Sequence, residues 1–305
     1  RHSEQTNFSI ERETKLMSSA IITLLSGLAG MFGWGIYDFL AGVYSKKIGP
    51  HKTLFWSQLA GLFFVLLLIL VFAFNLNISF LTFFLLIVAA IFYCSGYLFF
   101  MRGFEIGNIS IVAAIMNLWA VFTMLIAFFF MGQRLSILQS IGVLMIISGA
   151  TLVSLNWNDI KKNGFQLSLG VKETILGAFF FGVFWNISEV ITEEIGWLLT
   201  TVFVKIGVII FLLLLSFLLK RELRLTKVST KIKIIVVLMG ILEAGVVAIV
   251  NFGLTIGDAI LITPIASALS VVTITMAIIF LKDKITKLQG LGIISAISGI
   301  IITGF

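Results

Sequence analysis

Long apolar stretches, separated by short polar ones, make up the chain from about residue 20 onward. A helix needs about 20 apolar residues to cross the hydrocarbon core, because the core is about 30 Å thick and each residue rises about 1.5 Å. None of the stretches alternates between polar and apolar residues as the strands of a membrane barrel do. The pattern therefore predicts an all-α integral membrane protein with ten transmembrane helices. The expected spans are roughly 20–44, 54–74, 79–101, 109–130, 136–155, 173–192, 197–219, 232–252, 259–281 and 287–304.

The amino-acid composition requires lipid as the solvent of this chain. Hydrophobic residues make up 60% of it and charged residues 11%, whereas a soluble domain carries about 25% charged residues. The mean hydropathy is +1.16. These values exclude a soluble enzyme, a nucleic-acid-binding domain and a disordered protein. Cys94 is the single cysteine and the two histidines are not spaced as metal ligands, so we expect no disulfide within the chain, no metal site and no cofactor.

Basic residues are distributed unequally between the two sides of the predicted bundle, and the net charge is +7. The side that holds both termini carries Arg1, Arg12, Lys15 and Arg134. The opposite side carries a larger set, which includes Lys46, Lys47, Lys52, Lys161, Lys162, Lys172, Lys220, Arg221, Arg224, Lys227, Lys231, Lys233, Lys282, Lys284 and Lys287. Basic loops stay in the cytoplasm. The charges therefore predict a multi-pass protein of the cell (plasma) membrane with both termini on the outer side.

The two halves of the chain resemble each other, which indicates an internal repeat. A shift of 150 residues aligns residues 103–155 with the second half without a gap, and at a shift of 151 Trp34 meets Trp185. The matched pairs are Gly103 with Gly253, Gly107 with Gly257, Gln139 with Gln289, Gly142 with Gly292, and Ser148-Gly149 with Ser298-Gly299. Each half has five spans, an odd number, so the second half must enter the membrane in the opposite sense. The sequence thus predicts a 5+5 inverted repeat, a design that many secondary transporters use.

This repeat divides the chain into four parts. Residues 1–19 form a polar N-terminal tail without the apolar core of a signal peptide, and we expect a short surface helix or a disordered segment there. Residues 20–155 form the first repeat, residues 156–172 a linker, and residues 173–305 the second repeat.

Short motifs of the two halves resemble a known superfamily. The first span contains Gly33-Trp34-Gly35, the fifth begins with Leu138-Gln139 followed by Gly142, and the ninth contains Thr263-Pro264. In this order the motifs resemble the drug/metabolite transporter superfamily in its ten-helix form with two EamA-type halves, over about residues 20–305. The resemblance implies a secondary transporter whose inner helices line a central cavity.

Two positions depart from the pattern of that superfamily. Ala114 stands where members often have a proline. The acid that members often show in the following turn is replaced by Gln133 in the first half and present as Asp283 in the second. Many members are described with cytoplasmic termini, whereas the basic residues of this chain predict outer termini, and we keep the prediction from the charges.

Four charged residues lie inside the predicted spans, namely Asp38, Glu189, Lys205 and Glu243. A charge at the bilayer centre costs about 2.5–3.5 kcal/mol on insertion scales, so each one needs a partner or a function. Asp38 and Glu189 coincide under the shift of 151, and the inversion places one toward each membrane face. We interpret them as two acids that bind a proton or attract a cation at the two mouths of one pathway. The alternative is that each is an interface residue that snorkels to water.

Glu243 lies midway along the eighth span, and its repeat mate is Tyr93. A lone carboxyl group in apolar surroundings favours its neutral form, which would let Glu243 take up and release a proton near the midplane. The alternative is an ion pair between Glu243 and Lys205 that only joins the seventh and eighth spans, since buried acids and bases in bundles often pair. The sequence leaves both interpretations open.

Aromatic residues are frequent in the inner spans and suggest a binding site. Together, one acid and four aromatic residues would form a box that attracts an organic cation through cation–π interaction: Asp38, Trp34, Tyr93, Trp119 and Trp185. The further candidates for substrate contacts are Tyr37, Asn117, Thr263 and Ser267. The alternative for each aromatic residue is packing or contact with lipid, and for Pro264 it is a kink that a neighbouring helix repairs.

Glycines recur seven residues apart in the fifth and tenth spans, as Gly142 and Gly149 and as Gly292 and Gly299. Faces of small residues let helices approach closely. We predict that these two spans pack against each other within one chain, which favours a monomer. A homodimer through the same faces is the alternative.

Together these features predict a secondary active transporter of a small organic metabolite, such as an amino acid, an amine or a related solute, that works by alternating access. The sequence contains no nucleotide-binding or catalytic motif, so we expect no enzyme and transport driven by a gradient of protons. The expected partners are the solute, the lipid bilayer and protons, with no nucleic acid. An uncoupled facilitator or exchanger of choline-like cations or sugars is the first alternative. A channel or a non-transporting membrane scaffold is the second.

Overall fold

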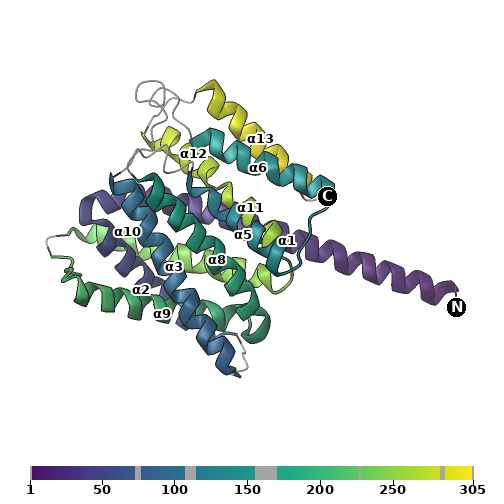
Figure 1. Ribbon diagram of the computed structural model, residues 1–305, viewed down its shortest axis with the longest axis horizontal. Helices are drawn as coiled ribbons and strands as arrows, with labels where there is room; N and C mark the ends of the chain where they lie inside the picture. The colour runs from purple at the N-terminus through teal and green to yellow at the C-terminus, as the bar shows by residue number, and fades with distance from the viewer. Residues whose placement is uncertain are drawn as a thin grey trace.

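The computed structural model consists of helices that run back and forth through one bundle (Figure 1). It describes residues 2–72, 77–106, 115–154, 170–226, 228–281 and 286–303, and every regular element in these ranges is a helix. In chain order the helices are α1 (His2–Ile48), α2 (Pro50–Ile69), α3 (Phe80–Ile106), α5 (Leu118–Phe130), α6 (Ile137–Ser154), α8 (Val171–Ile195), α9 (Trp197–Leu218), α10 (Thr230–Leu254), α11 (Ala259–Ser267), α12 (Leu269–Leu281) and α13 (Lys287–Thr303). Most of the predicted linker lies outside the described residues, as do Ala114 and Asp283.

The helices coincide with the ten expected spans. In the described part of the chain, seven segments are long and apolar enough to cross a membrane, and α11 and α12 together form one of them. The shorter apolar helices Leu118–Phe130, Ile137–Val153 and Lys287–Thr303 account for the fourth, fifth and tenth spans. The expected beginning of the fourth span lies outside the described residues. The predicted all-α membrane fold is thereby confirmed.

The polar N-terminal segment continues α1 and does not form a separate element. α1 runs unbroken from His2 to Ile48, and Figure 1 shows its first part projecting beyond the bundle. No glycine or proline precedes Gly27. The local sequence therefore contains no helix breaker between the polar segment and the first span.

The ninth span, predicted as one helix, consists of α11 and α12 with a turn at Ala268 between them. Pro264 has no N–H group to donate within α11. The N–H of Ala268 bonds to the carbonyl of Ile265, only three residues earlier, at 3.2 Å. The fourth span has a turn at Asn117, the repeat mate of Ser267. Both halves therefore interrupt the corresponding helix at nearly the same place, as the helices at binding sites of secondary transporters often do.

Residues that touch their own repeat mates locate the axis between the two halves. The ring centroids of Trp34 and Trp185 are 5.2 Å apart. The hydroxyl of Tyr93 donates a hydrogen bond to Glu243, which is 150 residues further along the chain. A residue can reach its mate only close to a pseudo-twofold axis, so both pairs lie close to that axis.

Contacts between the helices are equivalent when the two halves are exchanged. α3 packs on α8 as α10 packs on α1, α2 packs on α10 as α9 packs on α3, and α5 packs on α8 as α11 and α12 pack on α1. Corresponding helices run in opposite directions, since α1 begins at the end of the bundle where α8 finishes (Figure 1). The structure thus contains the inverted repeat that the sequence predicts.

α6 and α13 lie side by side at the edge of the bundle (Figure 1) and touch through glycines. A methyl group on Gly142 would lie 2.8 Å from the carbonyl oxygen of Gly299, and one on Gly149 would lie 2.6 Å from that of Gly292. The two backbones can come this close only where side chains are absent. The predicted packing of the fifth and tenth spans is therefore present, and these glycine faces are covered within the chain.

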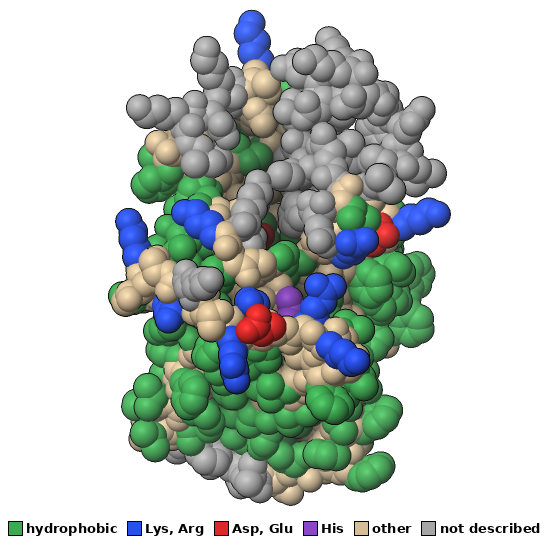
Figure 2. All heavy atoms as spheres, turned by 90° about the vertical axis from the view of Figure 1, so that its left-hand side faces the viewer, with side chains coloured by type: hydrophobic (Ala, Val, Ile, Leu, Met, Phe, Trp, Pro, Cys, Tyr) green, Lys and Arg blue, Asp and Glu red, His purple; other side chains and the backbone are tan. Residues whose placement is uncertain are grey.

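The two ends of the bundle differ in charge. Figure 1 places both termini at one end, called the terminal end below, and the loop between α9 and α10 at the other, called the basic end. Lysine and arginine side chains gather on the basic end (Figure 2). α1 and α3 finish at the basic end, whereas α8 begins there (Figure 1). The last turns of α1 and α3 and the first turns of α8 therefore lie toward the basic end.

Candidate functional site

A cavity lies between α1, α3, α5, α8 and the first residue of α12. It contains about 450 Å³ of empty space, counting the part that is open to solvent. The part that a water-sized sphere can occupy is about 50 Å³, well below the roughly 300–1,000 Å³ of sites that hold small organic molecules, so the cavity must widen to take one. The lining is mainly aromatic and aliphatic, with one carboxylate, two tyrosine hydroxyls and three indole N–H groups as its polar groups; it consists of Trp34, Asp38, Tyr93, Tyr97, Phe100, Met116, Trp119, Phe181, Trp185 and Leu269.

Three tryptophans from three different helices form one wall of this cavity. Trp34 lies on α1, Trp119 on α5 and Trp185 on α8. The ring centroids are 5.2 Å apart for Trp34 and Trp185, 6.1 Å for Trp34 and Trp119, and 6.3 Å for Trp119 and Trp185. Each side chain is at most 7% exposed, so the rings hold one another in place. A cation against such a ring gains about 0.5–2 kcal/mol.

A second wall comes from α3 and α8. Tyr97 packs on Tyr93 and on Phe181, with centroid distances of 5.1 and 5.0 Å. Gly96 allows this approach, because a methyl group there would lie 2.5 Å from the ring of Phe181. The sequence does not single out Tyr97, Phe100, Met116, Phe181 and Leu269 as site residues. Phenylalanine is too common to indicate a site, with 30 residues in the chain. The sequence feature that could have pointed to this wall is a glycine that faces a ring, such as Gly96 opposite Phe181.

Asp38 supplies the carboxylate of the cavity. It follows Trp34 by one helical turn on α1 and is partly exposed. Among the described residues, none donates a hydrogen bond to this carboxylate or forms an ion pair with it. The described lining also contains no lysine, arginine or histidine. The negative charge of Asp38 is therefore available to a ligand.

Glu189, the repeat mate of Asp38, lies near the terminal end in a different environment. It is 2% exposed and does not line the cavity. Its Oε1 accepts hydrogen bonds from Nε2 of Gln133 at 2.7 Å and from the backbone N–H of Ala259 at 3.2 Å. Gln133 in turn accepts a hydrogen bond from the backbone N–H of Ile260 at 3.1 Å. Glu189 and Gln133 thereby tie α8 and the turn after α5 to the first turn of α11, whose free N–H groups favour a carboxylate.

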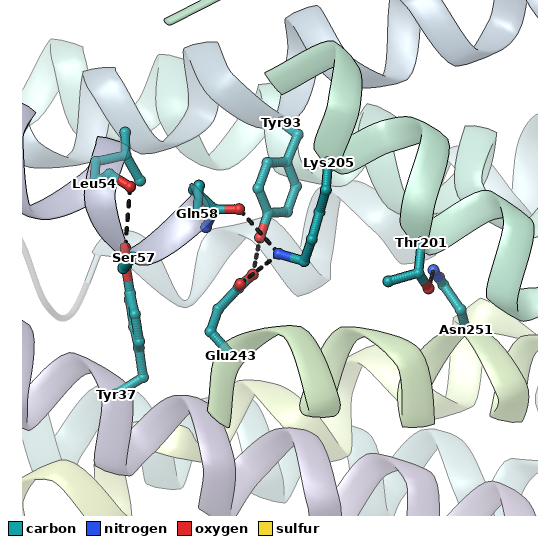
Figure 3. A network of polar contacts seen from close by, with 9 residues as sticks. All are labelled: Tyr37, Leu54, Ser57, Gln58, Tyr93, Thr201, Lys205, Glu243 and Asn251. Carbon is teal, nitrogen blue, oxygen red and sulfur yellow. Dashed lines mark hydrogen bonds and ion pairs between the residues drawn. The ribbon is translucent and has the colours of Figure 1, made fainter. Parts of the chain in front are cut away.

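Glu243 forms a buried ion pair with Lys205 (Figure 3), the arrangement that the sequence leaves open as the alternative to a lone carboxyl group. The two charged atoms are 2.6 Å apart, and both side chains are at most 2% exposed. Lys205 also donates to Oε1 of Gln58 at 2.9 Å, and Tyr93 donates to the second carboxylate oxygen of Glu243. The charge of Glu243 is thus compensated where it lies, between α9, α10, α2 and α3.

Tyr93 connects this ion pair to the cavity. Its hydroxyl bonds to Glu243 while its side chain is part of the cavity lining. Tyr37 lies nearby but outside the lining: it is 1% exposed, shares a hydrogen bond of 3.3 Å with Ser57 (Figure 3), and packs its ring on that of Tyr97. The central network therefore borders the cavity through one side chain, Tyr93.

The remaining polar candidates lie beside the two helix interruptions. Thr263 donates to the carbonyl of Ala259, and Ser267 to that of Pro264, each at 2.7 Å. Asn117 is 2% exposed, and its Nδ2 has no hydrogen-bond partner among the described residues. None of the three lines the cavity. The structure thus brings five of the candidate residues together around one space: Trp34, Asp38, Tyr93, Trp119 and Trp185.

Comparisons with known proteins place this geometry in context. The sequence model of the EamA-like transporter family matches the chain twice, over residues 21–155 and 168–305. No curated protein matches the chain. A solved crystal structure, described only as that of a protein, superimposes with a TM-score of 0.74 over 93% of this chain and 95% of that chain. At 14% sequence identity, this likeness establishes the shared fold alone.

Proposed function

This chain belongs to the EamA-like transporter family, whose members are membrane transporters of small solutes and not enzymes, and from that premise we propose that it carries a small organic cation across the membrane by alternating access. The cation occupies the cavity between α1, α3, α5, α8 and α12. Its charge lies near Asp38, and its apolar part lies against the tryptophans.

The observation that carries this proposal is an unpartnered carboxylate in a mainly aromatic cavity. Asp38 has no hydrogen-bond or ion-pair partner among the described residues. Three tryptophans and two tyrosines share the lining with it, and no basic side chain does among the residues described. An ammonium group satisfies both the carboxylate and the ring faces. The carboxylate of an amino acid would find no cationic partner there, which favours amines and quaternary ammonium compounds.

Alternating access follows from the inverted repeat. The cavity extends from Trp34 and Tyr93 near the pseudo-twofold axis toward the basic end, where Phe100 lies close to the end of α3. At the terminal end, Glu189 and Gln133 close the bundle against α11. If the two halves exchange conformations, the basic end closes and the terminal end opens. The cation drives this exchange only as far as it prefers one arrangement over the other.

Proton coupling is part of the proposal and is assigned to Asp38 and Glu189. Glu243 is less suited to this role because Lys205 already compensates its charge. A proton and a cation cannot both neutralise Asp38, so they compete for it. Such competition supports exchange of an external proton for an internal cation or the reverse. A membrane scaffold, by contrast, would have no need of a cavity with an unpaired acid.

The test uses the purified protein in proteoliposomes loaded with unlabelled choline. Labelled choline outside should accumulate by counterflow, saturate with concentration, and respond to an imposed pH gradient. The control competitor is the uncharged isostere of choline in which carbon replaces the quaternary nitrogen. We expect choline to compete and the isostere to compete at least tenfold less well. Equal competition by the two compounds contradicts a cation site, unsaturable flux indicates a channel, and indifference to the pH gradient leaves an uncoupled facilitator.

A further inference from the structure

The loop between α9 and α10 is fixed to α2 by side chains near the beginning of α2. Nε1 of Trp56 donates to the carbonyl of Leu223 at 2.7 Å. Nζ of Lys52 donates to the carbonyl of Arg224 at 3.1 Å and pairs with Glu222 at 3.7 Å. These contacts hold residues 222–224 of the loop against α2 at the basic end.

A groove lies between this loop and α10. It contains about 850 Å³ of empty space, counting the part that is open to solvent. Its lining includes the basic side chains of Arg224 and Lys233, the indole of Trp56, and the apolar side chains of Leu225, Val236 and Val237. No acidic residue of the described chain lines it. The groove therefore combines two positive charges with an apolar floor.

The groove lies at the boundary between the basic end and the lipid-facing surface. Figure 2 shows lysine and arginine side chains around this end and hydrophobic side chains below them. Next to Val237 of the groove, α10 presents Ile234 and Leu238, which are 54% and 56% exposed. Glu222 lies in this loop outside the groove lining, and its carboxylate is 3.7 Å from Nζ of Lys52. A tryptophan such as Trp56 at this level is typical of the membrane interface.

We propose that this groove binds an anionic phospholipid, with its phosphate between Arg224 and Lys233 and an acyl chain along the apolar face of α10. The positive charges match the phosphate, and the exposed aliphatic side chains match the chain. A soluble anion would use only the first of these features. Basic loops stay on the cytoplasmic side, and pockets of this kind on that side bind anionic lipid headgroups.

Native mass spectrometry of the detergent-purified full chain tests this proposal. The probes are phosphatidylglycerol and phosphatidylcholine of the same acyl composition. The groove variant is Arg224→Gln/Lys233→Gln. The matched control is Arg221→Gln/Lys231→Gln, which removes the same charge from the same loop and helix but not from the groove lining. We expect wild type and control to retain phosphatidylglycerol over phosphatidylcholine, and the groove variant to lose about tenfold of that retention.

Two outcomes overturn the proposal. If both variants lose phosphatidylglycerol equally, the attraction is a diffuse effect of the basic end and the groove is not a site. If inorganic phosphate displaces the lipid as effectively as a short-chain phosphatidylglycerol does, the site recognises a soluble anion. The assay needs no transport activity, and unchanged thermal unfolding of both variants confirms that they are folded. Its result therefore bears on the groove independently of the proposed cation transport.

Discussion

Asp38 and Glu189 occupy the same position in two copies of one structural unit, yet their surroundings are opposite. Asp38 lines a cavity and has no hydrogen-bond or ion-pair partner among the described residues. Glu189 is buried and accepts hydrogen bonds from Gln133 and from the first turn of α11. The helix contacts of the two halves are otherwise equivalent, and under the alternating access proposed above we interpret this difference as one conformational state of the protein. In that proposed state, the end with Asp38 would accept a ligand and the end with Glu189 would be closed.

Between the two ends lies a region that we expect to stay the same in both states, the ion pair of Glu243 and Lys205. Replacing Glu243 with Gln leaves the ammonium of Lys205 without its counter-charge in the interior. Loss of one partner of a buried pair costs about 3–5 kcal/mol, so we expect a large fall in the midpoint of thermal unfolding. This is the largest effect anticipated for any single substitution here.

The double variant Glu243→Met/Lys205→Met is the control for that prediction. It removes both charges, and replacement of a buried pair by apolar side chains is often neutral for stability. We therefore expect it to recover most of the lost stability. If Glu243→Gln alone unfolds like the wild type, the pair does not stabilise the centre and Glu243 returns as a candidate proton site.

Substitution of each repeat-related acid sharpens the comparison between the two ends. Asp38→Asn removes the charge that faces the ligand, so we expect choline affinity to fall about 10- to 30-fold, which is about 1.4–2 kcal/mol. Glu189→Gln changes a residue outside the cavity and should alter affinity less than about threefold. Isothermal titration of the two purified variants measures both values. Equal losses of choline affinity in the two variants would show that the ligand does not distinguish Asp38 from Glu189, which contradicts a site at Asp38 alone.

Gln133→Ala tests whether the terminal end is closed by side chains. The substitution removes the hydrogen bonds of Gln133 with Glu189 and with the N–H of Ile260. Each is worth about 0.5–1.5 kcal/mol, so amide exchange in the first turn of α11 should become about tenfold faster. Gln139→Ala is the matched control, because the oxygen of Gln139 accepts from the nearby Ser136 N–H in its own turn. Unchanged exchange in Gln133→Ala would mean that packing alone closes this end.

The tryptophans provide the smallest effect and a contrast with the acids. Trp34 and Trp185 are repeat mates, but both line the same cavity and touch each other. Because tryptophan is the best cation–π partner, we expect Trp34→Phe and Trp185→Phe to weaken choline binding by similar factors of about two to five. Trp56→Phe, outside the cavity, should have no effect on the affinity. Strongly unequal losses of choline affinity in the two variants would show that the ligand lies closer to one tryptophan and away from the pseudo-twofold axis.

Much of the fold can be predicted from the sequence because each span is specified by local hydrophobicity. The ten spans and the inverted repeat require only the lengths of the apolar runs and the alignment of the two halves. The interruption at Ala268 is harder to predict. The hydrogen bond from the N–H of Ala268 to the carbonyl of Ile265, which ends α11, lies four residues after Pro264 and not at the proline itself. The interruption at Asn117 has no proline signal among the described residues at all.

The site is only partly predictable, because its chemistry depends on which side chains meet across helices. Asp38 and the tryptophans are conspicuous in the sequence and do come together. By contrast, Gln58 and Gln133 have no periodicity or spacing that reveals their partners, yet they decide the surroundings of Lys205 and Glu189. Pairing of this kind is set by tertiary packing, which the positions along one chain do not encode in readable form.

The pH dependence of choline binding tests the difference between the two acids most directly. Only the ionised form of Asp38 attracts the cation, so affinity should be full above the titration of this carboxyl group and fall as the pH decreases through it. We predict that wild type and Glu189→Gln show the same dependence between pH 5 and 9, while Asp38→Asn binds weakly and shows none. A dependence that persists in Asp38→Asn and disappears in Glu189→Gln would contradict the account.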